Sequence, residues 1–143
     1  MPNVDTVRGI YDAFGRGDVA AILETLADDV EWEYGVNSTT VPWLQPRRGR
    51  DAVPGFFETL FSAIEIHRFE PKEFLEGEDL VVVIIDFEFT VRATGRRVVE
   101  EDEAHVWRFA GGKVVRFRHR ADTHQQQQAF EGGAVGSPSA ETR

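Results

Sequence analysis

The amino-acid sequence predicts an α+β fold in which helices come first and an antiparallel sheet follows. Through the first third of the chain, apolar residues recur at three- and four-residue spacing, as they do on one face of a helix. From about residue 65 onward, apolar and polar residues alternate instead, which is the period of a strand with one buried face. Thr94-Gly95 and Gly111-Gly112 interrupt this alternation as hairpin turns would. Helices followed by a run of strands are typical of the α+β class.

Three helices are expected before residue 65. The first covers residues 4–14, where apolar side chains form one stripe before a Gly-Arg-Gly segment ends it. Asp18 is placed to cap a second helix over residues 19–26. The third follows Asp51 and has Pro54 in its first turn, where proline is tolerated.

The strands are expected in two groups. Residues 30–34 alternate strictly between the second and third helices, with Val30, Trp32 and Tyr34 on one face. A strand of about ten residues then ends near Leu75. The strands expected after it cover residues 80–91, 98–109 and 114–121.

Size and composition indicate one globular domain, over residues 1–130, with a flexible C-terminal tail over residues 131–143. The chain has 143 residues, of which 41% are hydrophobic and 29% are charged. A formal charge of −9 makes a nucleic-acid partner unexpected, because phosphate contacts need a basic surface. The absence of cysteine excludes disulfides and thiolate chemistry. No segment has the length of a membrane span or the pattern of a secretion signal, so we expect a cytoplasmic protein without a membrane partner.

The two hairpin turns predict which side chains share a face of the sheet. With the glycine pair as a two-residue turn, His119 lies opposite Ala104, and with the Thr-Gly pair as another, Asp102 lies opposite Phe87. We assign this mostly apolar face to a pocket. Its expected members are Ile85, Phe87, Phe89, Glu100, Asp102, Ala104, Val106, Phe117, His119 and Ala121.

The other face of the predicted sheet interleaves opposite charges, among them Glu103 and Arg118, with two rings, His105 and Trp107. These rings are unusual on a wholly solvated surface. We therefore expect this face to form a homodimer interface in which Trp107 stacks near Arg116.

Three segments carry a family resemblance, namely Tyr11-Asp-Ala-Phe-Gly-Arg-Gly-Asp18, Leu26-Ala-Asp-Asp-Val-Glu-Trp32 and His105-Val-Trp-Arg-Phe-Ala-Gly-Gly-Lys-Val-Val115. They resemble the nuclear transport factor 2-like superfamily, and within it the SnoaL-like group that includes polyketide cyclases. The resemblance implies a cone-shaped, curved antiparallel sheet wrapped around three N-terminal helices, with one apolar pocket, usually in a dimer. It does not imply one reaction, because the superfamily holds isomerases, cyclases, dehydratases and non-enzymatic binders.

Ketosteroid isomerase has the same layout and offers a comparison at the level of residues. Its catalytic tyrosine and two aspartates fall on Ile10, Tyr34 and Ala104 of this chain, and none of the three matches. Steroid isomerisation by that set of residues is therefore not expected.

The candidate catalytic residues are His119, Asp102 and Asp122. His119 is the expected acid or base, since imidazole titrates near neutral pH, and Asp102 stands diagonally from it as its orienting carboxylate. The resemblance implies an acid at the end of the last strand, which is Asp122. Tyr34 is expected to donate a hydrogen bond to developing charge. The side chains expected to bind substrate are Tyr11, Trp32, Tyr34, Phe87, Phe89, Val106 and Phe117.

These residues favour a cofactor-independent enzyme that performs a cyclase, isomerase or lyase step on a small hydrophobic molecule. A dimeric binding module with the same pocket but no chemistry is the alternative, and a structural dimer with a filled pocket is a third possibility. A metal is not expected, because His119 and Asp102 supply only two ligands.

Overall fold

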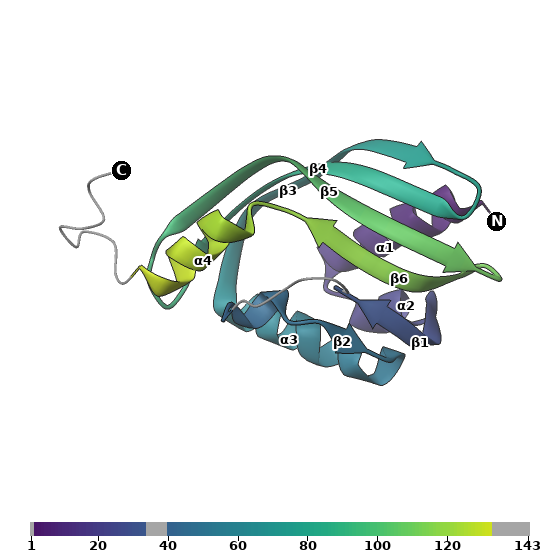
Figure 1. Ribbon diagram of the computed structural model, residues 1–143, viewed down its shortest axis with the longest axis horizontal. Coiled ribbons are helices and arrows are strands. Elements are labelled where there is room, and N and C mark those ends of the chain that lie inside the picture. The colour runs from purple at the N-terminus through teal and green to yellow at the C-terminus, as the bar shows by residue number, and fades with distance from the viewer. Residues whose placement is uncertain (1, 34–39, 133–143) are drawn as a thin grey trace.

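The computed structural model describes residues 2–33 and 40–132 of the chain (Figure 1). Its helices are α1 (Asn3–Arg16), α2 (Val19–Leu23), α3 (Val53–Ala63) and α4 (Thr123–Glu131). Its strands are β1 (Leu26–Trp32), β2 (Arg47–Arg48), β3 (Ile64–Glu76), β4 (Leu80–Val91), β5 (Arg97–Ala110) and β6 (Lys113–Arg120). None of the helices in these residues is long and apolar enough to cross a bilayer.

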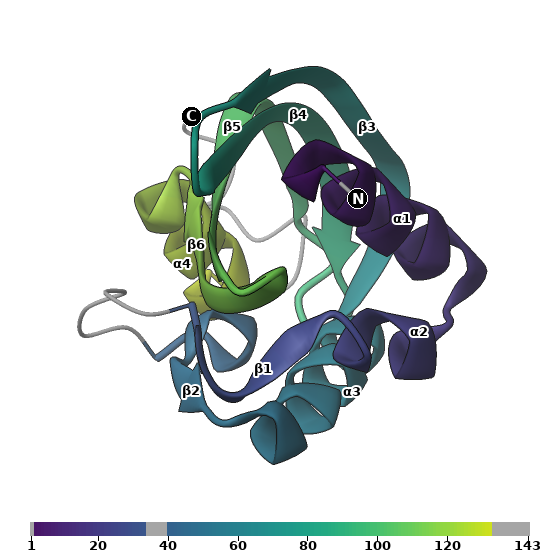
Figure 2. The same cartoon turned by 90° about the vertical axis from the view of Figure 1, so that its right-hand side faces the viewer.

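The strands form one six-stranded sheet in the order β2-β1-β6-β5-β4-β3. Neighbouring strands are antiparallel except for β1 and β6, which run parallel, so the sheet is mixed where an antiparallel one was predicted. Figure 2 shows β3, β4 and β5 curving over α1, with α3 on the far side of β1. The α+β class is confirmed, and the sheet stays open between β2 and β3.

The helices begin and end at residues that the sequence marks. Gly17 has a left-handed φ of 71° and ends α1. The side chain of Asp18 accepts a hydrogen bond from the Ala21 backbone N–H at 3.1 Å, which confirms the predicted cap of α2. This helix is shorter than predicted, because β1 already begins at Leu26.

A bulge in β6 changes the faces predicted from the glycine hairpin. The two-residue turn is confirmed, since Ala110 pairs with Lys113. The register then shifts: Phe109 pairs with Val114, but Arg108 pairs with Arg116. Beyond a bulge the alternation of the bulged strand is reversed relative to its partner.

A second bulge lies in β5. Between the pairs Ile85–Glu103 and Phe87–Glu100, one residue of β4 faces two residues of β5. One of the two is Asp102, whose φ of 61° is left-handed, an uncommon conformation outside glycine. The turn between β4 and β5 also holds four residues rather than two, because the Val91 backbone N–H donates to the Arg96 carbonyl at 2.8 Å.

The two bulges correct the predicted faces of the sheet. Glu103, His105 and Trp107 join Phe117 and His119 on the inner, helix-covered face. Asp102, Ala104 and Val106 take the outer face, together with Arg116 and Arg118.

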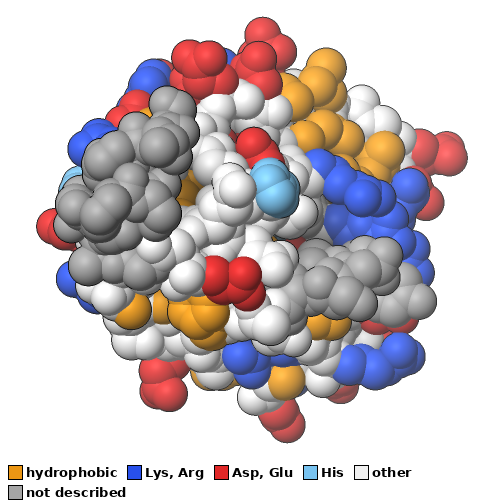
Figure 3. All heavy atoms as spheres, turned by 60° about the vertical axis from the view of Figure 1, so that its left-hand side comes forward, with side chains coloured by type: hydrophobic (Ala, Val, Ile, Leu, Met, Phe, Trp, Pro, Cys, Tyr) orange, Lys and Arg blue, Asp and Glu red, His pale blue; other side chains and the backbone are white. Residues whose placement is uncertain are grey.

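Helix α4 covers the edge of β5 beyond the end of β6, where Ala104 pairs with Arg120. The backbone edge groups there need partners. Gln125 supplies them: its side-chain oxygen accepts from the Val99 N–H, and its amide donates to the Val99 carbonyl, both at 3.2 Å. The glutamine tract, residues 125–128, lies within α4. Figure 3 brings this end of the molecule forward, and the middle of the visible face is mostly uncharged.

Candidate functional site

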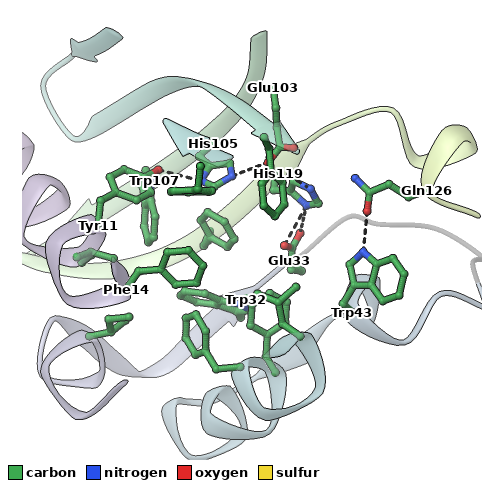
Figure 4. A pocket seen from close by; sticks show the side chains of 18 residues that line it. Tyr11, Phe14, Trp32, Glu33, Trp43, Glu103, His105, Trp107, His119 and Gln126 are labelled. Carbon is green, nitrogen blue, oxygen red and sulfur yellow. Dashed lines mark hydrogen bonds and ion pairs between the residues drawn. The ribbon is translucent and has the colours of Figure 1, made fainter. Parts of the chain in front are cut away.

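A pocket lies between the inner face of the sheet and helices α1, α2 and α3 (Figure 4). Most of the side chains that line it are aromatic. Its cavity volume is about 70 Å³, which is below the roughly 300–1,000 Å³ of drug-sized ligand sites. The sequence-predicted residues that line it are Tyr11, Trp32, Phe87, Phe117 and His119.

Two other predicted binding residues are not part of this lining. Phe89 is fully buried and packs edge-on against Trp43, with ring centroids 6.0 Å apart. Val106 lies on the outer face, because the bulges reverse its orientation. Tyr34 lies outside the described residues.

The two predicted catalytic aspartates also lie away from the pocket, so the expected Asp102–His119 contact is wrong. Asp102 sits in the bulge with a side chain that is 71% exposed, and it accepts a hydrogen bond from Lys72 Nζ at 2.7 Å. Asp122 is exposed and caps α4, where its side chain accepts from the Gln125 N–H at 3.0 Å.

A chain of hydrogen bonds runs along one wall of the pocket, at its α1 end. Trp107 Nε1 donates to the Tyr11 hydroxyl at 3.0 Å, and this hydroxyl lies 2.8 Å from His105 Nδ1. His105 Nε2 lies 2.8 Å from Oε2 of Glu103. An ionised carboxylate only accepts, so Nε2 carries a proton, and Tyr11 then donates to a bare Nδ1. Every donor in this chain therefore has an acceptor. Trp107 and His105, predicted at a dimer interface, are instead buried pocket residues.

His119 lies between two buried carboxylates. Its Nδ1 is 3.0 Å from Oε2 of Glu33, and its Nε2 is 3.6 Å from Oε2 of Glu103. Glu33 follows the last residue of β1 and is 2% exposed, with a left-handed φ of 58°. Trp32 pairs with Phe117 across the parallel strands, so a regular strand would bring Glu33 beside Arg118. The left-handed backbone of Glu33 turns its side chain to His119 instead.

The charges of this cluster follow from its carboxylates. Burial lowers the pKa of His119, but the negative charges of Glu33, Glu103 and Glu100 outweigh burial and raise this pKa from 6.5 to about 10. Burial works to raise the pKa of Glu103, and the charge of His119 with the hydrogen bond from His105 holds it below its usual range. Burial raises the pKa of the Tyr11 phenol well above 10. At neutral pH the site thus holds an imidazolium, an ionised Glu103 and a neutral phenol.

The α4 end of the pocket is closed by a polar bridge. Trp43 Nε1 donates to Oε1 of Gln126 at 2.7 Å, and the amide of Gln126 donates to Glu100. The other Glu100 oxygen accepts from the Asp122 backbone N–H at 2.7 Å. Burial raises the pKa of Glu100, although both hydrogen bonds oppose that rise. Glu100, predicted on the pocket face, thus tethers α4 to the sheet.

Sequence reasoning missed Glu33, Glu103 and His105. Glu103 ends an acidic run that is typical of a solvated rim, and no residue marks the bulge that turns it inward. Glu33 follows Trp32 in an alternating strand, where consecutive side chains point to opposite faces. Its left-handed backbone breaks that rule, and both residues line the pocket. Within residues 2–33 and 40–132, no group of three His, Asp and Glu side chains is arranged to hold a metal ion.

A known protein family has the sequence pattern of this chain. The model of the SnoaL-like domain matches residues 7–117. The chain belongs to this family. No protein of curated function matches this SnoaL-like domain in a sequence search.

Solved structures share its fold over nearly the whole chain. A nuclear transport factor 2-like protein of unknown function from Burkholderia pseudomallei is 32% identical, with a TM-score of 0.80, and the match covers 92% of this chain and 99% of that one. TerC, crystallised with polyporic acid, is 26% identical, with a TM-score of 0.72 and coverage of 92% and 99%. A protein from Pseudomonas putida, provisionally named a polyketide cyclase, has the same fold at 16% identity, a TM-score of 0.74 and coverage of 90% and 98%.

Proposed function

We propose that this SnoaL-like domain is an enzyme that moves a proton on a small, mostly apolar carbonyl compound, as part of a cyclisation, isomerisation or lyase step. The observation that carries the proposal is the state of the Glu103 carboxylate. Its Oε2 is held by His105, whereas its Oε1 is buried and has no hydrogen-bond partner among the described residues. A carboxylate with one oxygen anchored and the other bare in a pocket is positioned to act as a base.

The proposed step takes a proton from the carbon beside the carbonyl group to Glu103 Oε1. The electron pair of that C–H bond stays on the substrate as an enolate. Where the enolate is conjugated with a C=C bond, return of the proton to its far carbon completes an isomerisation. Attack of the enolate on a second carbonyl closes a ring, and the proton held by Glu103 then passes to the resulting alkoxide. Glu103 is ionised at neutral pH, as a base must be, because its pKa lies below the usual range.

His119 takes a different role from the one predicted. As an imidazolium with a pKa of about 10, it is already protonated and cannot accept a proton at neutral pH. Its positive charge offsets one of the two carboxylates that flank it, so a second negative charge can develop in the pocket at lower cost. The comparison with TerC supports a small organic molecule as the occupant.

Deuterium exchange tests the proposal without the natural substrate. We expect the wild type to speed the exchange of the protons beside the carbonyl of 2-tetralone in D₂O, followed by NMR. In Glu103→Gln the catalysed rate should fall by about 10²–10⁴-fold, the usual contribution of a positioned base. Asp102→Asn, one residue away on the outer face, is the matched control and should exchange like the wild type. Equal rates in Glu103→Gln and the wild type would exclude Glu103 as the base.

A non-catalytic binding module is the second candidate function, favoured by the complete pairing of His119 with Glu33 and Glu103. A site whose charged groups already have partners is stable without a reaction to perform. In this case 2-tetralone would bind without any exchange above the buffer rate.

The homodimer stays a prediction, but its interface would be formed by residues other than the Trp107 that the sequence suggested. Trp107 is only 2% exposed and is unavailable for an interface. On the outer face, Val82 lies directly opposite Val106, and both are partly exposed beside the arginines of β6. We propose that this face joins two copies, and sedimentation at micromolar concentration should show a dimer that Val106→Lys dissociates. A cytoplasmic location also stays a prediction.

A further inference from the structure

The three tryptophans of the chain differ in the partner of the indole N–H. Trp43 donates to Gln126 at 2.7 Å, and Trp107 donates to Tyr11 at 3.0 Å. Trp32 Nε1 is also buried, but it has no hydrogen-bond partner in the part of the chain that the structure describes. A buried donor left without an acceptor carries a free-energy cost that proteins avoid in most cases.

Packing, rather than a hydrogen bond, sets the orientation of the Trp32 ring. Four aromatic rings surround it, with centroid distances of 4.5 Å to Phe117, 5.6 Å to Phe56, 5.7 Å to Phe57 and 5.9 Å to Trp107. The residue is 1% exposed, so the ring cannot turn its N–H to solvent without disturbing these contacts. The donor is therefore held in place before anything binds.

An unpartnered acceptor lines the same pocket. Glu103 Oε1 and Trp32 Nε1 are both buried without a partner among the described residues, and both side chains belong to the pocket lining. Figure 4 shows them entering the pocket from different elements, Glu103 from β5 and Trp32 from β1. A ligand that satisfies this pair must accept one hydrogen bond and donate another.

We infer that Trp32 selects the ligand, through a hydrogen bond from its indole N–H to an oxygen of a neutral, hydroxylated ring compound whose hydroxyl proton faces Glu103. A phenol or enol hydroxyl both accepts and donates. An ionised carboxylate only accepts, and it would place a second negative charge beside Glu103. The aromatic walls suit a flat ring. The inference rests on the proposed function and deepens it: an enol is the tautomer that a carbonyl compound reaches when the proton taken by Glu103 is returned to its oxygen, and that hydroxyl then faces the same carboxylate.

NMR of the indole N–H groups tests the inference on the wild-type protein. The probes are 4-methylphenol and 1,4-dimethylbenzene, which have nearly the same shape but differ by a hydroxyl and a methyl group. Each Trp→Phe variant removes one indole signal, and so assigns it. We expect the Trp32 signal to move downfield with 4-methylphenol and not with 1,4-dimethylbenzene, while the Trp43 and Trp107 signals keep their positions.

Affinities of the variants provide a second measurement. Trp32→Phe should weaken 4-methylphenol about tenfold and leave 1,4-dimethylbenzene nearly unchanged, as loss of one hydrogen bond predicts. Trp43→Phe is the matched control, because its N–H already has a partner, and it should leave the ratio of the two affinities as in the wild type.

Three results would overturn the inference: no binding of 4-methylphenol to the wild type, equal weakening of both probes by Trp32→Phe, or an unmoved Trp32 signal in the bound state. These results are separate from a failure of the proposed function, because neither probe has a C–H beside a carbonyl. If proton transfer alone is wrong, 2-tetralone shows no Glu103-dependent exchange while the discrimination between the two probes remains.

Discussion

Two histidines that face each other on the pocket wall differ in the partner of one ring nitrogen. His105 and His119 lie directly opposite each other on β5 and β6, with ring centroids 5.7 Å apart, and both contact Oε2 of Glu103. The second nitrogen of His105 meets the neutral phenol of Tyr11, whereas that of His119 meets the carboxylate of Glu33. Burial is similar, since both side chains are 9% exposed. The partner of the second nitrogen therefore distinguishes the two rings, and Glu33 makes His119 a cation.

Removing each histidine in turn should give the largest difference in stability between the two positions. His119→Gln leaves the buried carboxylates of Glu33 and Glu103 without their cation, so we expect a loss of about 3–5 kcal/mol in the free energy of unfolding. His105→Gln removes hydrogen bonds but no charge and should cost about 1–3 kcal/mol. Urea unfolding measures both, with the exposed His124→Gln as the control. Equal losses for His105 and His119 would contradict the assigned difference in charge.

The stability of the protein should depend on pH through the His119 cation. Because the pKa of His119 rises from 6.5 to about 10 on folding, its stabilisation is complete below pH 6.5 and is lost as the pH rises toward 10. In this window, unfolding releases one proton, so stability should fall by about 1.4 kcal/mol per pH unit.

Glu33→Gln tests the cause of this slope. Without the second carboxylate, the pKa of His119 should fall toward that of an ordinary histidine, and the alkaline loss of stability should flatten. Urea unfolding at a series of pH values from 6 to 10 gives both slopes. A wild-type curve as flat as that of Glu33→Gln would show that His119 is not held as a cation in the folded state.

The smallest effect on stability is expected at Asp102, which the sequence predicted as the carboxylate that orients His119. Asp102→Asn removes an exposed ion pair with Lys72, which should change the free energy of unfolding by no more than about 0.5–1 kcal/mol. The pKa of His119, measured by NMR, should be unchanged. A drop in that pKa would show that Asp102 stabilises the charged form of His119, as the sequence predicted.

Much of the fold was predictable because it depends on local pattern. Leu80–Val91 was predicted as a strand with the bounds that β4 has, and Asp18 was predicted to cap α2. These features follow from apolar spacing and from residues with clear terminal preferences. His119 was placed correctly on the pocket wall by the glycine hairpin, although through a register that the bulge later alters.

The partners of His119 were not predictable because two backbone irregularities decide them. Glu33 and Asp102 both have a left-handed φ, at residue types that carry no such signal, whereas a glycine would have suggested one. The bulge at Asp102 reverses the faces of β5, so the pocket receives Glu103 and His105 rather than the expected Asp102 and Ala104. A single extra residue per strand accounts for these errors.

The bulge in β5 also has a consequence for how such a pocket can diversify. A substitution alters one side chain, but loss of one residue at positions 101–102 would restore regular alternation and turn one half of the strand over. Glu103, His105 and Trp107 would then exchange places with Ala104, Val106 and Arg108. In this architecture the loss of one residue would change several pocket side chains at once, whereas a substitution changes only one.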